Sequence, residues 1–503
     1  MDRVLRNVHL FDPAEGLDRT CDLLIVEGTI AAIGSGLPVP VGGVELALDG
    51  ILAFPGLIDL HTHLREPASL SSPGEAGEDF LSGTAAASAG GFVQVVAMAN
   101  THPVIDSVER LTRAKARAAE MRQRGQAEVL QAAALTEGLA SKRPSPIEAL
   151  AAAGARVFSD DGRSLASPSV TLEAFSRVRE VEGVVFDHAE DASLTEGGVV
   201  SDGPWGRSSG LPLRPACAES IQVARDLALA AAAGSRLHLQ HLSTAASLDA
   251  VRAARRSGVA VTFEVTPHHL ILTEADLSTL GGLGRVNPPL RTAYDAQELL
   301  KAVCDGTVDA FATDHAPHPE ATKLASLASA APGIVGLETA ASLTYQWVRD
   351  GVLNLTRFVE LWSHGPSRIL GLDPNRLREG EPCRVTLFDP NAVFTVRGED
   401  FRSRAHLTPF EGRRLVGRPV GTLIGRSGFD AREPGEPRAR PIPTRSNARP
   451  DGQGSSGMAR PPTIPPGVRA HPGPDPTRIP SLAHFVRNGS EAARMARERG
   501  ASE

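Results

Sequence analysis

The chain has 503 residues, of which 41% are hydrophobic and 22% are charged, so it has enough apolar material to bury a large core. Its formal net charge is −7 with no basic patch in the main part of the chain, and no run reaches the roughly 20 apolar residues of a membrane span, so we expect neither nucleic-acid binding nor membrane insertion. The four cysteines are too widely spaced for a paired motif, which favours a chain without disulfides in the cytoplasm.

Short strand patterns occupy both flanks of the main part of the chain. The opening residues, MDRVLRNVHLFDP, carry charges and no apolar core, so they predict a strand and not a signal peptide. In residues 1–50 and again in residues 376–426, short apolar runs such as CDLLIVEGTIAAIG and RVTLFDP alternate with Gly and Pro turns. Because each flank is too short for a core of its own, we predict that the two flanks together form one small β domain.

Residues 51–375 repeat one theme, a short β-rich apolar run that ends in polar residues and is followed by an alanine-rich stretch with helical spacing. The runs are LAFPGLIDLHTH, GFVQVVAMANT, AEVLQAAALT, ARVFSDD, GVVFDHAED, RLHLQHLST, VAVTFEVTPHH and VDAFATDHAPH. Such alternation predicts parallel strands with crossover helices, and eight units close into a (β/α)₈ barrel of the TIM type. The polar residues then gather at the carboxyl ends of the strands, where barrel enzymes carry their active sites.

The composition changes after Arg426. Residues 427–503 contain 13 prolines and 12 arginines, with few large apolar residues and no sustained periodicity. This composition predicts a mostly disordered, basic tail attached to an acidic body.

The first run of the barrel ends in a pair of histidines. Side chains alternate along a strand, so His61 and His63 project to the same side. Neutral imidazoles suit zinc and its neighbours. A lone histidine is more often structural, but a His-x-His pair at the end of an apolar strand favours a metal site.

Further metal-ligand residues end the later runs. His188, His241 and the Asp314–His318 cluster occupy equivalent positions, so a barrel would bring them together. Asp160 and Asp161 end the fourth run, and a carboxylate there could bridge two cations held by the histidines. The pattern therefore predicts a binuclear centre.

A set of blocks in fixed order is far more specific than any single motif. From the first barrel strand to about residue 426 the chain resembles the dihydroorotase branch of the amidohydrolase superfamily, through HTHLREP, FSDDG, HAED, HLST, EVTPHHL, VNPPLR, ATDHAPH and GIVGLETA. The resemblance implies two zinc ions per subunit, with Asp161 and not Asp160 as the bridge. The implied ligands are His61, His63, Asp161, His188, His241 and Asp314.

The resemblance also implies a set of substrate contacts. Arg65 and His318 suit a substrate carboxylate, because a planar guanidinium can hold a carboxylate through two hydrogen bonds. The complete implied set is Arg65, Asn100, Asn287, His318, Pro332 and Gly333. To His268, His269, His102 and His364 we assign no chemistry.

The activity that the resemblance implies is the reversible hydrolysis of the cyclic amide of (S)-dihydroorotate to N-carbamoyl-L-aspartate, a step of pyrimidine biosynthesis. Two cations would lower the pKa of a shared water to give a hydroxide, and Asp314 would carry its proton to the departing nitrogen. The resemblance permits a homodimer and association with aspartate carbamoyltransferase.

Two alternatives stay open. A hydantoinase or allantoinase would share the barrel, but such relatives generally bridge their metals through a carboxylated lysine, and ARVFSDD offers no lysine. An inactive dihydroorotase-like partner of aspartate carbamoyltransferase would usually have lost ligands, whereas all six are present here. The segment ASLSSPGEAG, residues 68–77, is longer than the usual loop of the family, and MANT replaces the commoner proline-containing form; either change could shift the substrate loop.

Overall fold

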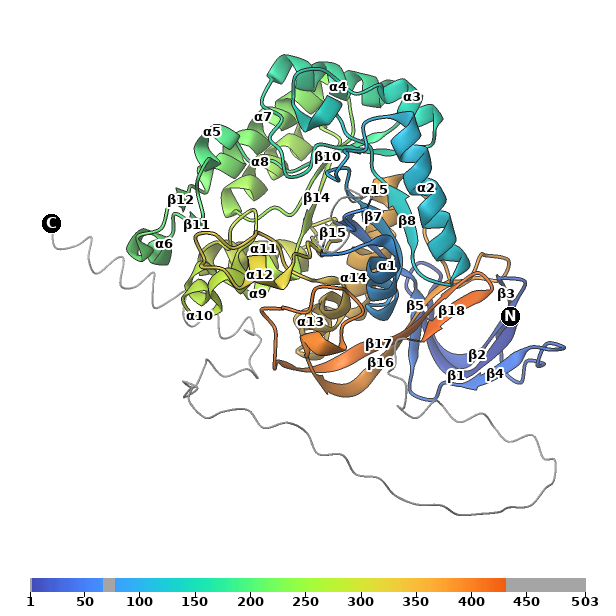
Figure 1. Ribbon diagram of the computed structural model, residues 1–503. Coiled ribbons are helices and arrows are strands. Elements are labelled where there is room, and N and C mark those ends of the chain that lie inside the picture. Colours follow the sequence, from blue (N-terminus) through green and yellow to red (C-terminus); the bar gives the residue numbers. More distant parts are fainter. Residues whose placement is uncertain (1, 67–76, 431–503) are drawn as a thin grey trace.

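The computed structural model describes residues 2–66 and 77–430 (Figure 1). Of the predicted long loop at residues 68–77, the structure describes only Gly77. From residue 431 onward, the predicted tail also lies outside the described residues. Within the described ranges, no helix is both long enough and apolar enough to cross a membrane.

Two parallel sheets form the main body. One has the order β6(Leu57–Thr62), β7(Phe92–Ala97), β8(Glu128–Gln131), and the other has the order β9(Val157–Ser159), β10(Val184–Asp187), β13(Leu237–Leu239), β14(Val261–Val265), β15(Ala310–Phe311). The parallel bridges Ala133–Phe158 and Thr62–His315 join the two sheets at both seams. The strands therefore close into an eight-stranded parallel barrel, and the expected fold class is confirmed.

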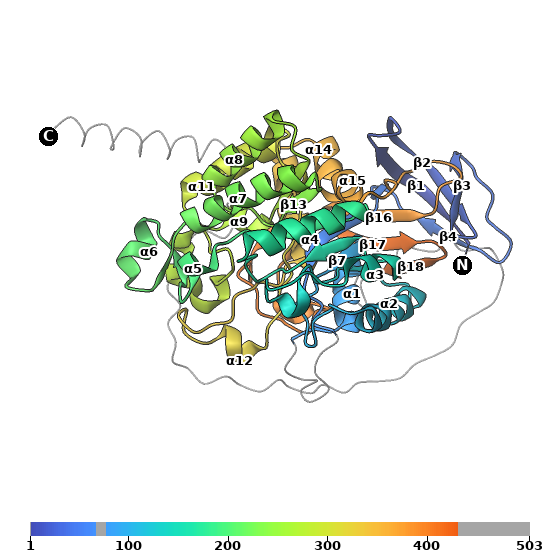
Figure 2. The same ribbon diagram turned by 90° about the horizontal axis from the view of Figure 1, so that it is seen from above.

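Helices surround this barrel (Figure 2). The longer ones are α1(Phe80–Ala89), α2(Val108–Gln123), α4(Pro168–Glu180), α7(Cys217–Ala233), α8(Ala245–Arg256), α11(Ala293–Cys304) and α13(Leu337–Arg349). Several begin where the sequence provides a capping side chain: Ser107, Ser167 and Thr244 each accept a hydrogen bond from a backbone N–H in the first turn.

Shorter elements complete the described chain. They are α3(Ile147–Ala152), α5(Ala192–Thr195), β11(Val200–Ser201), α6(Pro204–Ser209), β12(Leu213–Arg214), α9(Pro267–Ile271), α10(Leu277–Leu280), α12(Glu320–Lys323), α14(Leu355–Val359) and α15(Gly365–Leu370), with the single turns η1(Glu137–Leu139), η2(Glu274–Asp276), η3(Gly281–Gly284), η4(Glu360–His364) and η5(Gly398–Asp400).

The two flanks share a separate sheet, which lies beside the barrel (Figure 1). Its strands, in spatial order, are β18(Ser427–Asp430), β17(Arg414–Ile424), β16(Arg384–Thr395), β5(Leu52–Pro55), β1(Arg3–Asp12), β2(Leu17–Val26) and β3(Thr29–Gly34), with β4(Val44–Ala47) paired to β1. The expected joint β unit of the flanks is thus present, whereas the domain boundaries at 50, 375 and 426 stay predictions.

Two strands differ from the expected division of the chain. The first apolar run splits at Gly56, so that β5 joins the flank sheet and β6 opens the barrel. A Cβ at Gly56 would come within 2.4 Å of Val93 Cγ2, which explains a glycine at this crossing. Both halves are buried, so the sequence reads as one apolar run. In addition, Ser427–Asp430, which the composition assigns to the tail, pairs antiparallel with β17 as strand β18.

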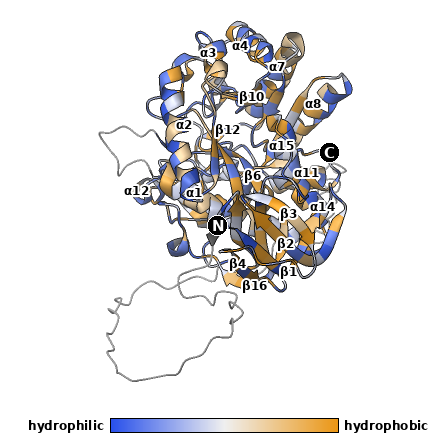
Figure 3. Ribbon diagram, turned by 90° about the vertical axis from the view of Figure 1, so that its right-hand side faces the viewer, coloured by the Kyte–Doolittle hydropathy of each residue, from blue (hydrophilic) through white to orange (hydrophobic). Residues whose placement is uncertain are grey.

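Apolar side chains fill both layers. Figure 3 shows mostly hydrophobic colouring along the strands and mixed colouring on the outer helices. Ile58, Leu60, Val96 and Phe186 are among the buried residues that pack together within the barrel. Aromatic rings connect the helices around the barrel to the flank sheet, for example Phe358 of α14 with its centroid 6.0 Å from that of Phe54 in β5. This packing holds the carboxyl ends of the strands in one place.

Candidate metal centre

Six predicted ligands meet at the carboxyl ends of the barrel strands. All are buried, with exposed fractions of 7% or less. His61 lies at the end of β6 and His63 just beyond it, Asp161 follows β9, His188 follows β10, His241 follows β13 and Asp314 follows β15.

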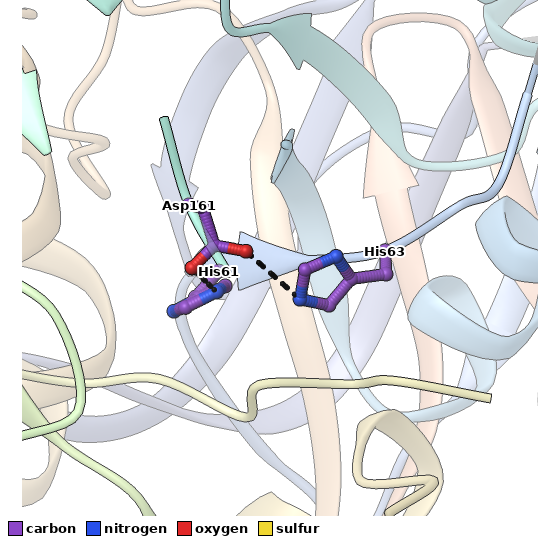
Figure 4. A group of neighbouring side chains, drawn as sticks. All are labelled: His61, His63 and Asp161. Carbon is purple, nitrogen blue, oxygen red and sulfur yellow. Dashed lines mark ion pairs between the residues drawn. The ribbon is translucent and has the colours of Figure 1, made fainter. Parts of the chain in front are cut away.

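Asp161 lies at the middle of the group. Its Oδ1 is 3.2 Å from His61 Nε2 and 3.5 Å from His188 Nδ1, and its Oδ2 is 3.5 Å from His63 Nε2 (Figure 4). His241 Nε2 lies 3.0 Å from His188 Nδ1. Two sets of ligand atoms result, each with all its atoms within 4.8 Å of one another, and both sets contain Asp161.

Asp314 closes the group from the opposite side of the barrel. Its Oδ1 is 3.1 Å from His63 Nε2 and 3.5 Å from His61 Nε2. The residue adopts a φ of 46°, in the left-handed region that residues other than glycine seldom occupy. Backbone strain of this kind clusters at functional sites, where the surrounding structure maintains it.

Hydrogen bonds to the outer nitrogens orient three of the imidazoles. His61 Nδ1 is 2.9 Å from a carboxylate oxygen of Glu264, and His188 Nε2 is 3.3 Å from one of Glu190. His63 Nδ1 is 3.1 Å from the amide oxygen of Asn100. In the neutral form of each ring, this oxygen accepts the single ring proton, which leaves the lone pair of the other nitrogen facing the centre for a cation.

Charge at the centre is arranged for cation binding. Burial would raise the pKa of the Asp161 carboxyl, but His61 and His188 hold it well below its usual value. Burial lowers the pKa of His241 well below its usual value, and the neighbouring imidazoles add to the effect. Burial would likewise lower the pKa of His61, but Asp161 and Asp314 outweigh burial and raise it. The carboxylates are therefore ionised at neutral pH.

These residues fit divalent metal ions. Asp161 Oδ1 is fully buried yet accepts no hydrogen bond, which is a costly state for an ionised oxygen without a cation. The ligand atoms are imidazole nitrogens and carboxylate oxygens, a combination that suits zinc and its neighbours. The neighbouring Asp160 is engaged elsewhere, because its Oδ1 accepts the N–H groups of Leu135 and Thr136 at 2.8 and 2.9 Å.

Arg65 and His318 lie together next to the centre. Arg65 Nε donates to the carbonyl of Pro317 at 3.3 Å, and its Nη2 is 3.4 Å from His318 Nε2. His318 Nε2 in turn donates to the carbonyl of Pro332 at 2.8 Å. Burial and the nearby guanidinium lower the pKa of His318 to about 3, so its ring is neutral. Within residues 2–66 and 77–430, Arg65 forms no ion pair with a carboxylate.

The other predicted substrate contacts bond to protein groups. Asn100 Nδ2 donates to Asp161 Oδ2 at 2.9 Å, so this amide connects two ligands. Asn287 Oδ1 accepts a hydrogen bond from Arg214 at 2.7 Å. The N–H of Gly333 donates to the carbonyl of Arg285 at 2.9 Å. The substrate roles of these residues stay predictions.

Known proteins resemble this chain over most of its length. A family model described as Dihydro-orotase-like matches residues 50–247. A dihydroorotase of Bacillus caldolyticus is 40% identical over 422 residues, which cover 84% of this chain and 97% of that relative. A dihydroorotase of Mycobacterium tuberculosis is 39% identical over 429 residues, with coverage of 84% and 97%.

The chain belongs to the dihydroorotase family. The resemblance noted in its sequence is therefore confirmed, and with it membership of the amidohydrolases.

Solved structures of hydantoinases share the fold of this chain. An L-hydantoinase (dihydropyrimidinase) of Arthrobacter aurescens superposes with a TM-score of 0.73 at 23% identity, covering 85% of this chain and 95% of that one. A D-hydantoinase (dihydropyrimidinase) of a Thermus species gives 0.72 at 22% identity, with coverage of 87% and 97%. At such identity the likeness concerns the fold alone.

Sequence reasoning assigned no role to the carboxylates behind this dihydroorotase centre. Glu264 is fully buried and lies between His61 and His238, whose Nε2 is 3.1 Å from its second oxygen. Glu190 pairs with Arg214 at 2.7 Å in addition to His188. A charged residue inside the apolar run VTFEV was a signal that could have revealed Glu264, because an unpaired buried carboxylate is rare.

Proposed function

We propose that this protein is a dihydroorotase that hydrolyses the cyclic amide of (S)-dihydroorotate to N-carbamoyl-L-aspartate and catalyses the reverse ring closure. The observation that supports the proposal most strongly is the convergence of four histidines and two aspartates, with Asp161 common to both sets of ligand atoms, in a chain that is 40% identical to a dihydroorotase.

Two zinc ions are proposed as the metals, held by His61, His63, Asp161, His188, His241 and Asp314. Such ions, when bound, would lower the pKa of a shared water and polarise the ring carbonyl. Asp161 contributes a buried anionic oxygen to both positions, which offsets the positive charge that two cations would otherwise place side by side.

Asp314 is the proposed proton carrier. Its pKa is held below the ordinary carboxyl value, because the nearby imidazoles of His61 and His63 outweigh the effect of burial. The carboxylate therefore stands ready to accept a proton from the attacking water and to donate it to the departing ring nitrogen. In the direction of ring closure, the same oxygen takes the proton from the ureido nitrogen.

Arg65 and His318 are the proposed contacts for the carboxylate of the substrate. The half-buried Arg65 guanidinium offers charge and hydrogen bonds to an acidic ring, and the His318 N–H joins it when the substrate carboxylate replaces the Pro332 carbonyl as its acceptor. Hydantoin carries no carboxylate, so this pair would favour dihydroorotate over hydantoin.

A ring-opening assay on the purified full chain tests the function. We expect turnover of dihydroorotate that is lost with a chelator and restored by zinc, and slower turnover of hydantoin or allantoin at equal concentration. Faster hydrolysis of hydantoin or allantoin would instead assign the protein to that branch of amidohydrolases. No turnover of any of these rings in zinc-loaded protein would favour an inactive partner of aspartate carbamoyltransferase.

The cellular setting is part of the proposal. The four cysteines are free thiols in the structure, which suits a reducing cytoplasm. We propose that the protein forms a homodimer and that it also binds aspartate carbamoyltransferase, an enzyme whose name describes the formation of the same carbamoyl aspartate. Analytical ultracentrifugation of the protein with and without that enzyme tests both proposals.

A further inference from the structure

His315 follows Asp314 directly, but its ring points away from the metal centre. Its Nδ1 accepts the N–H of Gly336 at 3.2 Å, so the ring proton must be on Nε2. That nitrogen donates to Glu78 Oε2 at 3.2 Å. Both side chains are buried, with exposed fractions of 1% for His315 and 0% for Glu78. The two hydrogen bonds leave the ring one tautomer and one orientation.

The backbone of His315 connects two segments of the metal centre. Its carbonyl accepts the N–H of His63 at 2.8 Å, and its own N–H donates to Thr313 Oγ1 at 3.0 Å. Asp314, between Thr313 and His315, has the unfavourable φ of 46°. Whatever holds the His315 ring therefore also holds Asp314 and His63 in position.

The carboxylate of Glu78 also accepts hydrogen bonds from two further parts of the chain. Ser82, in the first turn of α1, donates to its Oε1. Ser403 Oγ, from the C-terminal flank, donates to its Oε2 at 2.5 Å, and the N–H of Arg404 donates to Oε1 at 3.3 Å. Burial would raise the pKa of Glu78, but the hydrogen bond from His315 and those from the serines outweigh it, so the carboxyl is ionised.

The flank segment that carries Ser403 is itself anchored to the barrel. Glu338, in the first turn of α13, accepts the N–H groups of Arg402 and Ser403 through its Oε1 at 2.7 and 3.1 Å. Two kinds of contact therefore hold Ser403 in place: hydrogen bonds from the backbone of its segment to Glu338 of α13, and the hydrogen bond from its own hydroxyl to Glu78.

We propose that Ser403, Glu78 and His315 form a positioning relay, through which the C-terminal flank holds the backbone of Asp314 and His63 in the arrangement that catalysis requires. The flank would then act on the active site as well as on the stability of the fold. The inference rests on the proposed function, because its readout is turnover of dihydroorotate.

Variants of the relay residues, assayed in the full chain at saturating zinc, test the proposal. Glu78→Gln should lower kcat by about 10- to 100-fold and Ser403→Ala by about 10-fold, with KM changed by less than about twofold. Ser403→Thr keeps the hydroxyl and should recover most of the lost kcat. The double variant should be no slower than Glu78→Gln alone, because the serine acts through the carboxylate.

Ser363→Ala is the matched control. Ser363 is also a buried serine whose Oγ donates one hydrogen bond, here to the carbonyl of Gly56 at 2.9 Å, before the start of β6 and away from the metal centre. It should lower the melting temperature about as much as Ser403→Ala does, while kcat stays at the wild-type value.

Three outcomes would overturn the relay: wild-type kcat in both Glu78→Gln and Ser403→Ala, a kcat that extra zinc restores completely, or an equal loss of kcat in Ser363→Ala. The wild-type protein is measured in the same series. Absence of its turnover would contradict the proposed function, whereas normal wild-type turnover with unimpaired variants contradicts the relay alone.

Discussion

Hydrogen-bond partners distinguish the candidate ligand histidines of this protein from its structural ones. His61, His63 and His188 each bond an oxygen through one ring nitrogen and direct the other toward the centre. His269, close by in α9, has both nitrogens in bonds, with Thr266 Oγ1 at 2.8 Å and the carbonyl of Pro288 at 3.0 Å. A histidine whose two ring nitrogens both form hydrogen bonds, as in His269, has no free lone pair for a metal ion.

Asp314→Asn should separate proton transfer from metal binding. The amide keeps an oxygen near His63 but cannot take a proton at neutral pH, so kcat should fall by about 10²- to 10⁴-fold while bound metal persists. Metal analysis and steady-state kinetics on the same preparation provide the check. Near-normal turnover would remove Asp314 from the proton path.

His269 should make the protein sensitive to acid. Burial lowers its pKa to about 4, whereas an unfolded histidine titrates near 6.5, so between these values the unfolded state binds the extra proton. Stability is therefore complete above pH 6.5 and falls as the pH drops toward 4, by up to about 3 kcal/mol. Denaturant unfolding of metal-free wild type and metal-free His269→Gln at pH 7.5 and 5 checks this. The variant should lose less stability than wild type, and equal losses would contradict the assignment.

At the scale of elements, the flank sheet meets the barrel where β17 packs on α13. Gly417 in β17 has a φ of 89°, and a Cβ there would lie 2.4 Å from the ring of Tyr345, in α13. Tyr345 in turn packs on Phe388 of β16, with ring centroids 4.6 Å apart. The sheet can approach the helix this closely because position 417 has no side chain.

Gly417→Ala should therefore lower the free energy of unfolding by about 2–4 kcal/mol, through backbone strain and overpacking together. Gly412 precedes the same strand, has a φ of 73° and has nothing within 4 Å of the Cβ position. Gly412→Ala isolates the backbone term and should cost only about 1–2 kcal/mol. Chemical denaturation of both variants tests the difference, and equal costs would contradict a clash with Tyr345.

Across the whole molecule, the metal centre connects strands that are far apart in the sequence. Its candidate ligands lie at or just beyond the ends of β6, β9, β10, β13 and β15, so bound ions would cross-link both parallel sheets of the barrel. Without cations, the buried carboxylates of Asp161 and Asp314 are balanced by the imidazoles and, at Asp161, by the amide of Asn100.

Removing the metal should therefore cost stability as well as activity. Each site occupied at 100 times its Kd adds about 2.7 kcal/mol to the free energy of unfolding. A chelator should lower the melting temperature and abolish turnover, and added zinc should restore both, as calorimetry and the ring-opening assay would show. An unchanged melting temperature in protein shown to have lost its metal would contradict the cross-linking role.

The sequence by itself determined the barrel and the six candidate ligands that converge in it, because both depend on local patterns. Alternating apolar runs and helical stretches fix the order of parallel strands, and a polar residue at the end of such a run must lie at the carboxyl face. His61, His63, Asp161, His188, His241 and Asp314 could all be named on this basis, together with the family blocks around them.

Only the tertiary structure decided which groups support those ligands. The contacts of Glu264 with His61, of Glu78 with His315 and of Ser403 with Glu78 join residues more than 200 positions apart. The split of the first run at Gly56, and the pairing of Ser427–Asp430 with β17, likewise depend on which surface lies opposite. Such contacts depend on distance in space, and a pattern read along the chain contains no information about it.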